Sequence, residues 1–234
     1  MSFFVEPRTY RPPFWRTTPA RSPRAWLERT LWIVGTVLLG GCAWTVLQAG
    51  IYQKFQSWAL DQRAAGQSAS VGRFLESRVG LVKTSPPLPV APLPAADEPS
   101  VRRGDLVGRL EIPRLGMSAI VLEGDDDRTL RLGVGHVPGT AFPGRRGNVA
   151  LAAHRDTFFR PLRGIKPADR IAVTTTRGTY RYAVDFVRIV SPDDVAVLAD
   201  TARPSLTLVT CYPFYWVGNA PKRFVVRASR IDPS

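Results

Sequence analysis

The sequence LTLVTCYP occupies residues 206–213 and combines a strand pattern with a reactive side chain. Its larger apolar side chains alternate with smaller ones, which predicts a β-strand. Pro213 has no N–H to donate to a sheet, so Tyr212 and Pro213 are expected to stop the strand after Cys211. The thiol of Cys211 therefore lies at the end of this strand, where a side chain is accessible from the edge of the sheet.

The chain has only one other cysteine, Cys42. Two cysteines do not make a disulfide framework. A solitary thiol acts either as a small buried hydrophobe or as a nucleophile, and Cys211 alone does not distinguish the two.

Cys42 belongs to an apolar run of 21 residues, 31–51, that contains no charged side chain. A helix of this length extends about 30 Å, the thickness of a bilayer core. Trp32 and Tyr52 lie near the two ends of the run, as aromatic residues do at membrane interfaces. We expect a transmembrane anchor at 31–52. The competing interpretation is a cleaved signal peptide, with LGGC at 39–42 resembling a lipoprotein cleavage box.

The residues before this run form a tail at 1–30 that is rich in arginine and proline. Lysine and arginine outnumber acidic residues by 13 in the whole chain, and much of the excess lies in this tail. Positive charge before a transmembrane helix predicts a cytoplasmic N-terminus and an extracytoplasmic remainder. We therefore expect a membrane location and no nucleic-acid partner.

Three further segments follow the anchor. The alternation of polar and apolar side chains at 53–83 predicts juxtamembrane helices. Residues 84–100 read TSPPLPVAPLPAADEPS, and their prolines predict an extended linker. Residues 101–234 form a domain of short strands separated by turns, expected at 106–112, 118–122, 148–154, 170–175, 179–190, 206–211 and 224–229. Such a pattern is typical of an all-β barrel or sandwich. Short helical segments are expected at 127–132 and 158–165.

A nucleophilic thiol needs a base or cation and a group that stabilises an oxyanion. His154 follows the apolar strand at 148–153, and His136 lies in a glycine- and proline-rich segment. Spacing favours His154 only slightly. Arg223 begins the last strand and faces Cys211 if the two final strands are neighbours. An acidic run, EGDDD at 123–127, is better explained by helix capping than by metal binding, so we expect no metal and no cofactor.

Several motifs in this domain resemble those of class D sortases. They are GVGHVPGT at 133–140, GNVA at 147–150, HRDTFF at 154–159, TLVTC at 207–211 and VGNAPKRFVV at 217–226. They occur in the family's order over the whole domain. Two positions depart from the family pattern, since Ala153 and Ala168 stand where glycine is usual.

This resemblance implies an eight-stranded sortase-type β-barrel and a cysteine transpeptidase, a thiol peptidase that transfers an acyl group to an amine. It makes Cys211 the nucleophile, His154 the general acid and base, and Arg223 the group that positions substrate and stabilises the oxyanion. It makes Thr210 and Ala153 substrate-binding positions.

The implied partners are secreted proteins that carry an LPxTG-like sorting signal, and an amine acceptor on the cell envelope or a pilin. Two alternatives remain open. One is a membrane-tethered binding module with an inert thiol. The other is an L,D-type cell-wall cysteine transpeptidase, although its Ser-x-Gly-Cys-x-Arg pattern is absent.

Overall fold

The computed structural model describes residues 23–66, 69–70, 74 and 101–231. The chain consists of two compact units, residues 1–45 and 46–234. The expected linker at 84–100 and most of the tail at 1–30 lie outside the described residues, as do most residues of 65–83.

The N-terminal apolar run lies in helix α1, Pro23–Ala64. The helix begins within the tail, and Pro23 suits its first turn because proline lacks the N–H that would have no partner there. Apolar side chains such as Leu39 and Trp32 are exposed, at 73% and 78%. The hydroxyl of Thr36 donates to the carbonyl of Trp32, so this polar side chain is satisfied within the helix. By length and composition α1 can cross a membrane, as either an anchor or a signal sequence.

The C-terminal unit is built on a closed eight-stranded barrel with the strand order β1-β2-β3-β4-β7-β8-β6-β5. This confirms the predicted fold class. The strands are β1 Leu106–Ile112, β2 Met117–Glu123, β3 Val134–His136, β4 Asn148–Ala152, β5 Arg170–Thr175, β6 Gly178–Val190, β7 Ser205–Tyr212 and β8 Lys222–Arg230. One short α-helix, α3 Asp127–Leu132, and three 3₁₀ segments, η1 Pro113–Leu115, η2 Arg160–Gly164 and η3 Val195–Leu198, connect them.

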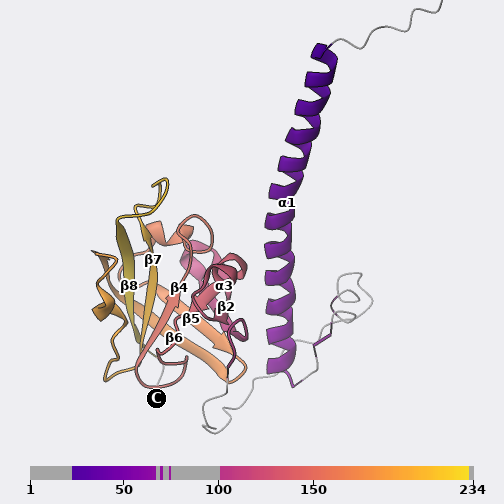
Figure 1. The fold of residues 1–234 in the computed structure, drawn as a ribbon. Coiled ribbons are helices and arrows are strands. Elements are labelled where there is room, and N and C mark those ends of the chain that lie inside the picture. Colours follow the sequence, from indigo (N-terminus) through magenta and orange to yellow (C-terminus); the bar gives the residue numbers. More distant parts are fainter. Residues whose placement is uncertain (1–22, 67–68, 71–73, 75–100, 232–234) are drawn as a thin grey trace, which may run out of the picture. The chain divides into compact units, whose positions relative to one another are not determined.

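Strand β7 lies between β4 and β8 in this order, and Figure 1 shows the three strands side by side. It pairs in parallel with β4 and antiparallel with β8. The C-terminal ends of β4 and β7 and the N-terminal end of β8 therefore meet at one end of the barrel. The register of these three strands determines which side chains lie level with one another at that end, including those of the candidate site.

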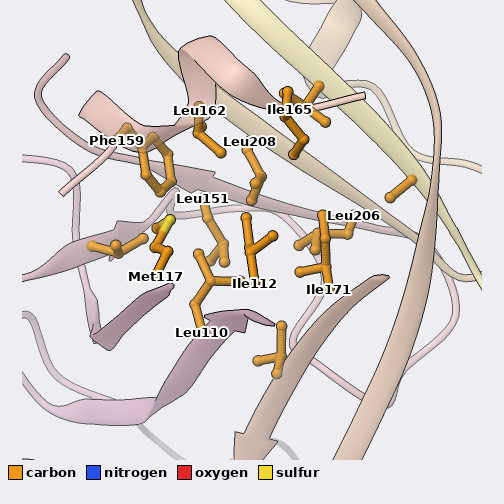
Figure 2. Packing of buried hydrophobic residues seen from close by; sticks show 14 of the residues in the cluster. Leu110, Ile112, Met117, Leu151, Phe159, Leu162, Ile165, Ile171, Leu206 and Leu208 are labelled. Carbon is orange, nitrogen blue, oxygen red and sulfur yellow. The ribbon is translucent and has the colours of Figure 1, made fainter. Parts of the chain in front are cut away.

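The interior of the barrel is filled by alternating apolar side chains. Leu206 and Leu208 of β7 are fully buried, together with Leu151 of β4. Figure 2 shows Leu162 of η2 and Phe159, the residue before η2, beside these side chains. This segment thus joins the core, which fixes the chain that follows β4.

At the start of β7 the outward face is buried as well. The hydroxyl of Thr207 donates to Oδ1 of Asn148 on β4, at 2.6 Å. The amide of Asn148 donates in turn to the carbonyls of Val197 and Ala199 beyond β6. A buried polar side chain is costly unless it is hydrogen-bonded, and this network meets that requirement. It holds β4 and β7 together near the ends where both strands begin, opposite the ends that carry the candidate site residues.

Candidate active site

Cys211 is the last residue but one of β7, and its side chain is half-buried. The strand ends at Tyr212, one residue beyond the predicted end at Cys211, and the bond between Tyr212 and Pro213 is cis. The aromatic rings of Tyr212, Phe214 and Phe224 pack on one another, with centroids 5.1 to 6.2 Å apart, and join the core of the barrel. This packing fixes the chain that directly follows Cys211.

Arg223 lies directly opposite the cysteine on the neighbouring strand. Cys211 and Arg223 are paired residues in the β7–β8 register. The guanidinium donates from Nη1 to the carbonyls of Lys222 and Ala220, at 3.2 and 3.4 Å. Among residues 101–231, no acceptor bonds to its Nε or Nη2. The sequence-based expectation that Arg223 faces Cys211 depended on these two strands being neighbours, and they are.

His154 lies on the side of β7 opposite Arg223, level with Cys211 along the strand. Ala152, the last residue of β4, pairs with Val209 in a parallel register, so the residue two positions further on lies level with Cys211. The chain continues along β7 past the end of β4, because the N–H of Ala153 donates to the carbonyl of Val209 at 3.3 Å. Beyond His154 the chain turns away, with the N–H of Phe159 bonded to the carbonyl of His154.

These three side chains line one cavity of about 270 Å³. Its remaining lining residues are Arg155, Asp156, Gly218, Asn219 and Ala220. The last three belong to the loop at 213–221, which joins β7 to β8. The cavity therefore opens at the end of the barrel where β4, β7 and β8 meet, with the loop as one wall.

Thr210 and Ala153, the two expected substrate-binding residues, do not line this cavity. Thr210 is 3% exposed and Ala153 is 5% exposed. The Thr210 hydroxyl donates to the Ala153 carbonyl at 2.7 Å. They lie side by side behind the cavity, where they join β7 to the segment that presents His154.

His136, the second candidate histidine, is in a different environment. It is the last residue of β3 and is 1% exposed. Its Nδ1 lies 2.7 Å from a carboxylate oxygen of Glu123, and its Nε2 lies 3.0 Å from the carbonyl of Ala141. The ring stacks on Phe142 with centroids 4.5 Å apart. Both nitrogens are thus occupied in the core, and the side chain does not line the cavity.

The acidic run at 123–127 has structural partners too. The Asp126 carboxylate accepts bonds from the N–H groups of Arg128 and Thr129 and caps α3. The hydrogen bond from the Thr129 hydroxyl lowers the pKa of Asp126, with further lowering by these N–H groups and the charge of Arg103, against an opposing effect of burial. Capping, the explanation favoured by the sequence, therefore accounts for this carboxylate.

Two arginines that donate hydrogen bonds to the loop at 213–221 were not singled out by sequence reasoning. Arg155 directly follows His154, and its Nη2 donates to the carbonyls of Trp216 and Gly218 at 2.7 and 2.9 Å. Arg163 donates to the hydroxyl of Tyr215 and lies over its ring. The sequence signal for Arg155 was its place beside His154, but its partners lie more than 60 residues away.

A thiol, an imidazole and a guanidinium in one cavity form a recognisable chemical set. A thiolate attacks a carbonyl carbon, an imidazole carries a proton to or from the leaving or attacking group, and a guanidinium stabilises an oxyanion. Arginine keeps its charge and presents its donors in a planar fork. The set suits acyl transfer through a thioester.

A family model described as "Sortase domain" matches residues 110–231, which includes all of these residues. Sortase D of Bacillus subtilis is 35% identical over 129 residues, covering 55% of this chain and 65% of that protein. Sortase A of Bacillus anthracis is 30% identical over 131 residues, covering 54% and 60%. The matched part therefore spans less than two thirds of each relative.

Solved structures show the same fold. The Sortase D5 transpeptidase of Clostridium perfringens superposes with a TM-score of 0.53 at 28% identity, covering 57% of this chain and 83% of that one. Sortase A of Corynebacterium diphtheriae gives a TM-score of 0.52 at 32% identity, covering 57% and 63%. Together, sequence and structure assign residues 110–231 to one fold family.

Proposed function

Because this chain belongs to the sortase family, we propose that it is a membrane-anchored cysteine transpeptidase acting on secreted proteins. The observation that carries the proposal is the cavity shared by Cys211, His154 and Arg223 at adjoining strand ends. The B. subtilis and C. perfringens relatives support it, the second of them described as a transpeptidase.

In the first step, the Cys211 thiolate attacks a backbone carbonyl carbon of the sorting signal. His154 gives its proton to the departing amine as the C–N bond breaks, and a thioester to Cys211 remains. Arg223 donates hydrogen bonds to the oxyanion that forms before this bond breaks.

In the second step, a primary amine attacks the thioester carbonyl. His154 takes the proton from the amine, the C–S bond breaks, and the thiolate is regenerated beside a new amide. Water competes with the amine, so the ratio of transfer to hydrolysis depends on how well the cavity holds the amine. We propose an LPxTG-like pentapeptide as donor and an amine of the envelope or of a pilin as acceptor.

The buried pair Thr210 and Ala153 supports this chemistry from behind the cavity. Their hydrogen bond connects the strand that carries Cys211 with the segment that carries His154. We propose that Thr210 and Ala153 contribute to substrate binding indirectly, by fixing these two segments, and not by touching the substrate.

The remaining segments suit a surface enzyme. We propose that residues 31–52 anchor the chain with its N-terminus in the cytoplasm, and that residues 84–100 separate the catalytic domain at 101–234 from the bilayer. A membrane-impermeant maleimide applied to intact cells tests this orientation. Cys211 is expected to react and Cys42, within the bilayer, is not. Labelling of Cys211 only after lysis would contradict it.

Mass spectrometry tests the activity directly. The full chain in detergent is incubated with a library of pentapeptides and with triglycine as amine. An acyl adduct on Cys211 and an amide product with triglycine are expected. Cys211→Ala is expected to give neither product while keeping the thermal stability of the parent chain. Cleavage by folded Cys211→Ala protein would refute the proposed mechanism.

A further inference from the structure

The loop at 213–221 connects the cysteine strand to the arginine strand and forms one wall of the cavity. It has few hydrogen bonds of its own. Within it, the structure gives one backbone bond, from the N–H of Trp216 to the carbonyl of Pro213 at 3.3 Å. Its tip is exposed, with Val217 at 95% and Tyr215 at 75%. Internal bonding therefore does little to fix its position.

Arg155 restrains the loop from the histidine side, in addition to the bond from Arg163 to the Tyr215 hydroxyl at the exposed tip. A single nitrogen, Nη2, bonds to the carbonyls of Trp216 and Gly218 at 2.7 and 2.9 Å. Hydrogen bonds from a cationic donor are stronger than neutral ones. Arg155, the residue next to His154, thus holds the loop at Gly218, which lines the cavity.

The loop in turn contacts Arg223. Two residues after Gly218, the carbonyl of Ala220 accepts a hydrogen bond from Nη1 of Arg223 at 3.4 Å. The carbonyl of Lys222 accepts a second bond from the same nitrogen, at 3.2 Å. A chain of contacts therefore runs from Arg155 through Gly218 and Ala220 to the guanidinium opposite Cys211.

We infer that Arg155 is a positioning residue, which holds the loop at 213–221 and through it orients Arg223 toward the reacting carbonyl. This inference rests on the proposed transpeptidase function. It assigns Arg155 an effect on the transition state that is transmitted through the loop, which its Nη2 holds. A misplacement of about 1 Å in an active site is enough to lower a rate about 100-fold.

Steady-state kinetics of the full chain in detergent test this role, with an internally quenched Leu-Pro-Glu-Thr-Gly peptide and triglycine. Arg155→Ala is expected to lower kcat about 10- to 100-fold and to change KM by less than about 3-fold. Arg155→Lys is expected to retain most of the activity, because one ammonium nitrogen can donate to both carbonyls. Arg160→Ala, an exposed arginine of η2, is the control for loss of charge and is expected to behave like the parent chain.

A double-mutant cycle identifies the path. If Arg155 acts through Arg223, then Arg155→Ala costs less than about 3-fold in an Arg223→Lys background. Full additivity of the two losses would overturn the inference. So would an unchanged kcat in Arg155→Ala. The alkylation rate of Cys211 by iodoacetamide, followed on the Cys211 peptide, is expected to stay within about 2-fold, and a parallel fall would instead indicate a direct effect on the thiol.

Hydrogen exchange separates failure of this inference from failure of the proposed function. Amides at 214–220 are expected to exchange faster in Arg155→Ala than in the parent chain and Arg160→Ala. If no pentapeptide is turned over but this difference is present, the proposed function fails while the hold on the loop stands. If peptides are turned over and exchange is unchanged, the inference about Arg155 is wrong.

Discussion

The two histidines of this chain occupy opposite chemical environments. His136 is buried, stacks on Phe142, and has an acceptor on each ring nitrogen. His154 is half-buried and lines a cavity that also contains Cys211. A proton carrier must reach both its partner and the substrate, so only the second environment suits catalysis. The difference shows that burial and the occupancy of the ring nitrogens distinguish the two roles.

The same contrast applies to arginines. The guanidinium of Arg114 is engaged in a structural ion pair: it bonds to the Asp169 carboxylate and to the carbonyl of Gly164. Arg223 has weaker bonds from one nitrogen and borders the cavity. Satisfied charged groups stabilise structure, whereas groups with donors to spare are available to a ligand. Substitutions at both kinds of residue can separate a role in stability from a role in activity.

His154→Ala is expected to produce the largest change. Loss of a general acid and base costs between about 10² and 10⁴ in rate, and we expect about 10³ in kcat/KM here. The free energy of unfolding is expected to stay within about 1 kcal/mol, because the side chain is half-exposed. Peptide cleavage and urea unfolding of the same preparation measure both quantities. A loss of less than about tenfold would remove His154 from the mechanism.

Arg223→Lys is expected to lower kcat by about 10²- to 10³-fold, as loss of an oxyanion donor does. Lysine keeps the positive charge but lacks the planar fork of donors. Arg227→Lys is the matched control, since it makes the same change on the same strand outside the cavity, where Arg227 bonds to Ser205 and Val197. Its activity per folded molecule is expected to be unchanged. Equal losses in the two variants would argue for a structural effect on β8.

Much of the barrel could be predicted from alternation and turn residues. Strands β1 and β5 begin and end where the sequence pattern places them, and β7 extends one residue further at each end. Strand β3, Val134–His136, was missed. It has three residues in a glycine-rich segment, and it is defined by parallel pairing with β2 and antiparallel pairing with β4. Such pairing depends on distant residues and leaves no periodicity in a short segment.

The two departures from the family's glycines also needed the structure. Ala168 has φ = 68°, in the left-handed region, which explains why glycine suits that position. Ala153 keeps an ordinary backbone and is buried behind the cavity. Spacing favoured His154 over His136 only slightly, because both follow or end short apolar segments. The contacts of the His136 ring with Phe142 and Glu123 support the same order.

His136→Ala is expected to affect stability rather than catalysis. It removes a buried ring and leaves the Glu123 carboxylate and the Ala141 carbonyl without their partner. A destabilisation of about 3 kcal/mol is expected from the cavity and the lost hydrogen bonds. The value of kcat/KM at a temperature where the variant is folded is expected to stay within about 2-fold. A large loss of activity with unchanged stability would reverse the roles assigned to the two histidines.

The smallest effect is expected at Asp169, and it should depend on pH. The hydrogen bond from Arg114 lowers the pKa of Asp169, and the N–H of Lys166 and nearby positive charges lower it further, against an opposing effect of burial. Because the folded pKa lies below the unfolded value near 3.8, the stabilisation is complete above that value and is lost as the pH falls through the folded pKa. Asp169→Asn is therefore expected to cost about 2 kcal/mol at pH 7.

The difference between Asp169→Asn and the parent chain should remain constant from pH 7 to pH 5 and shrink below about pH 4. Urea unfolding at several pH values measures it, and kcat/KM at pH 7 is expected to change by less than about 2-fold. Asp156, an exposed carboxylate of the cavity, provides the contrast. Asp156→Asn is expected to leave stability at pH 7 unchanged, because the side chain is exposed. A pH-independent cost at Asp169 would show that its shape, rather than its charge, supports the turn before β5.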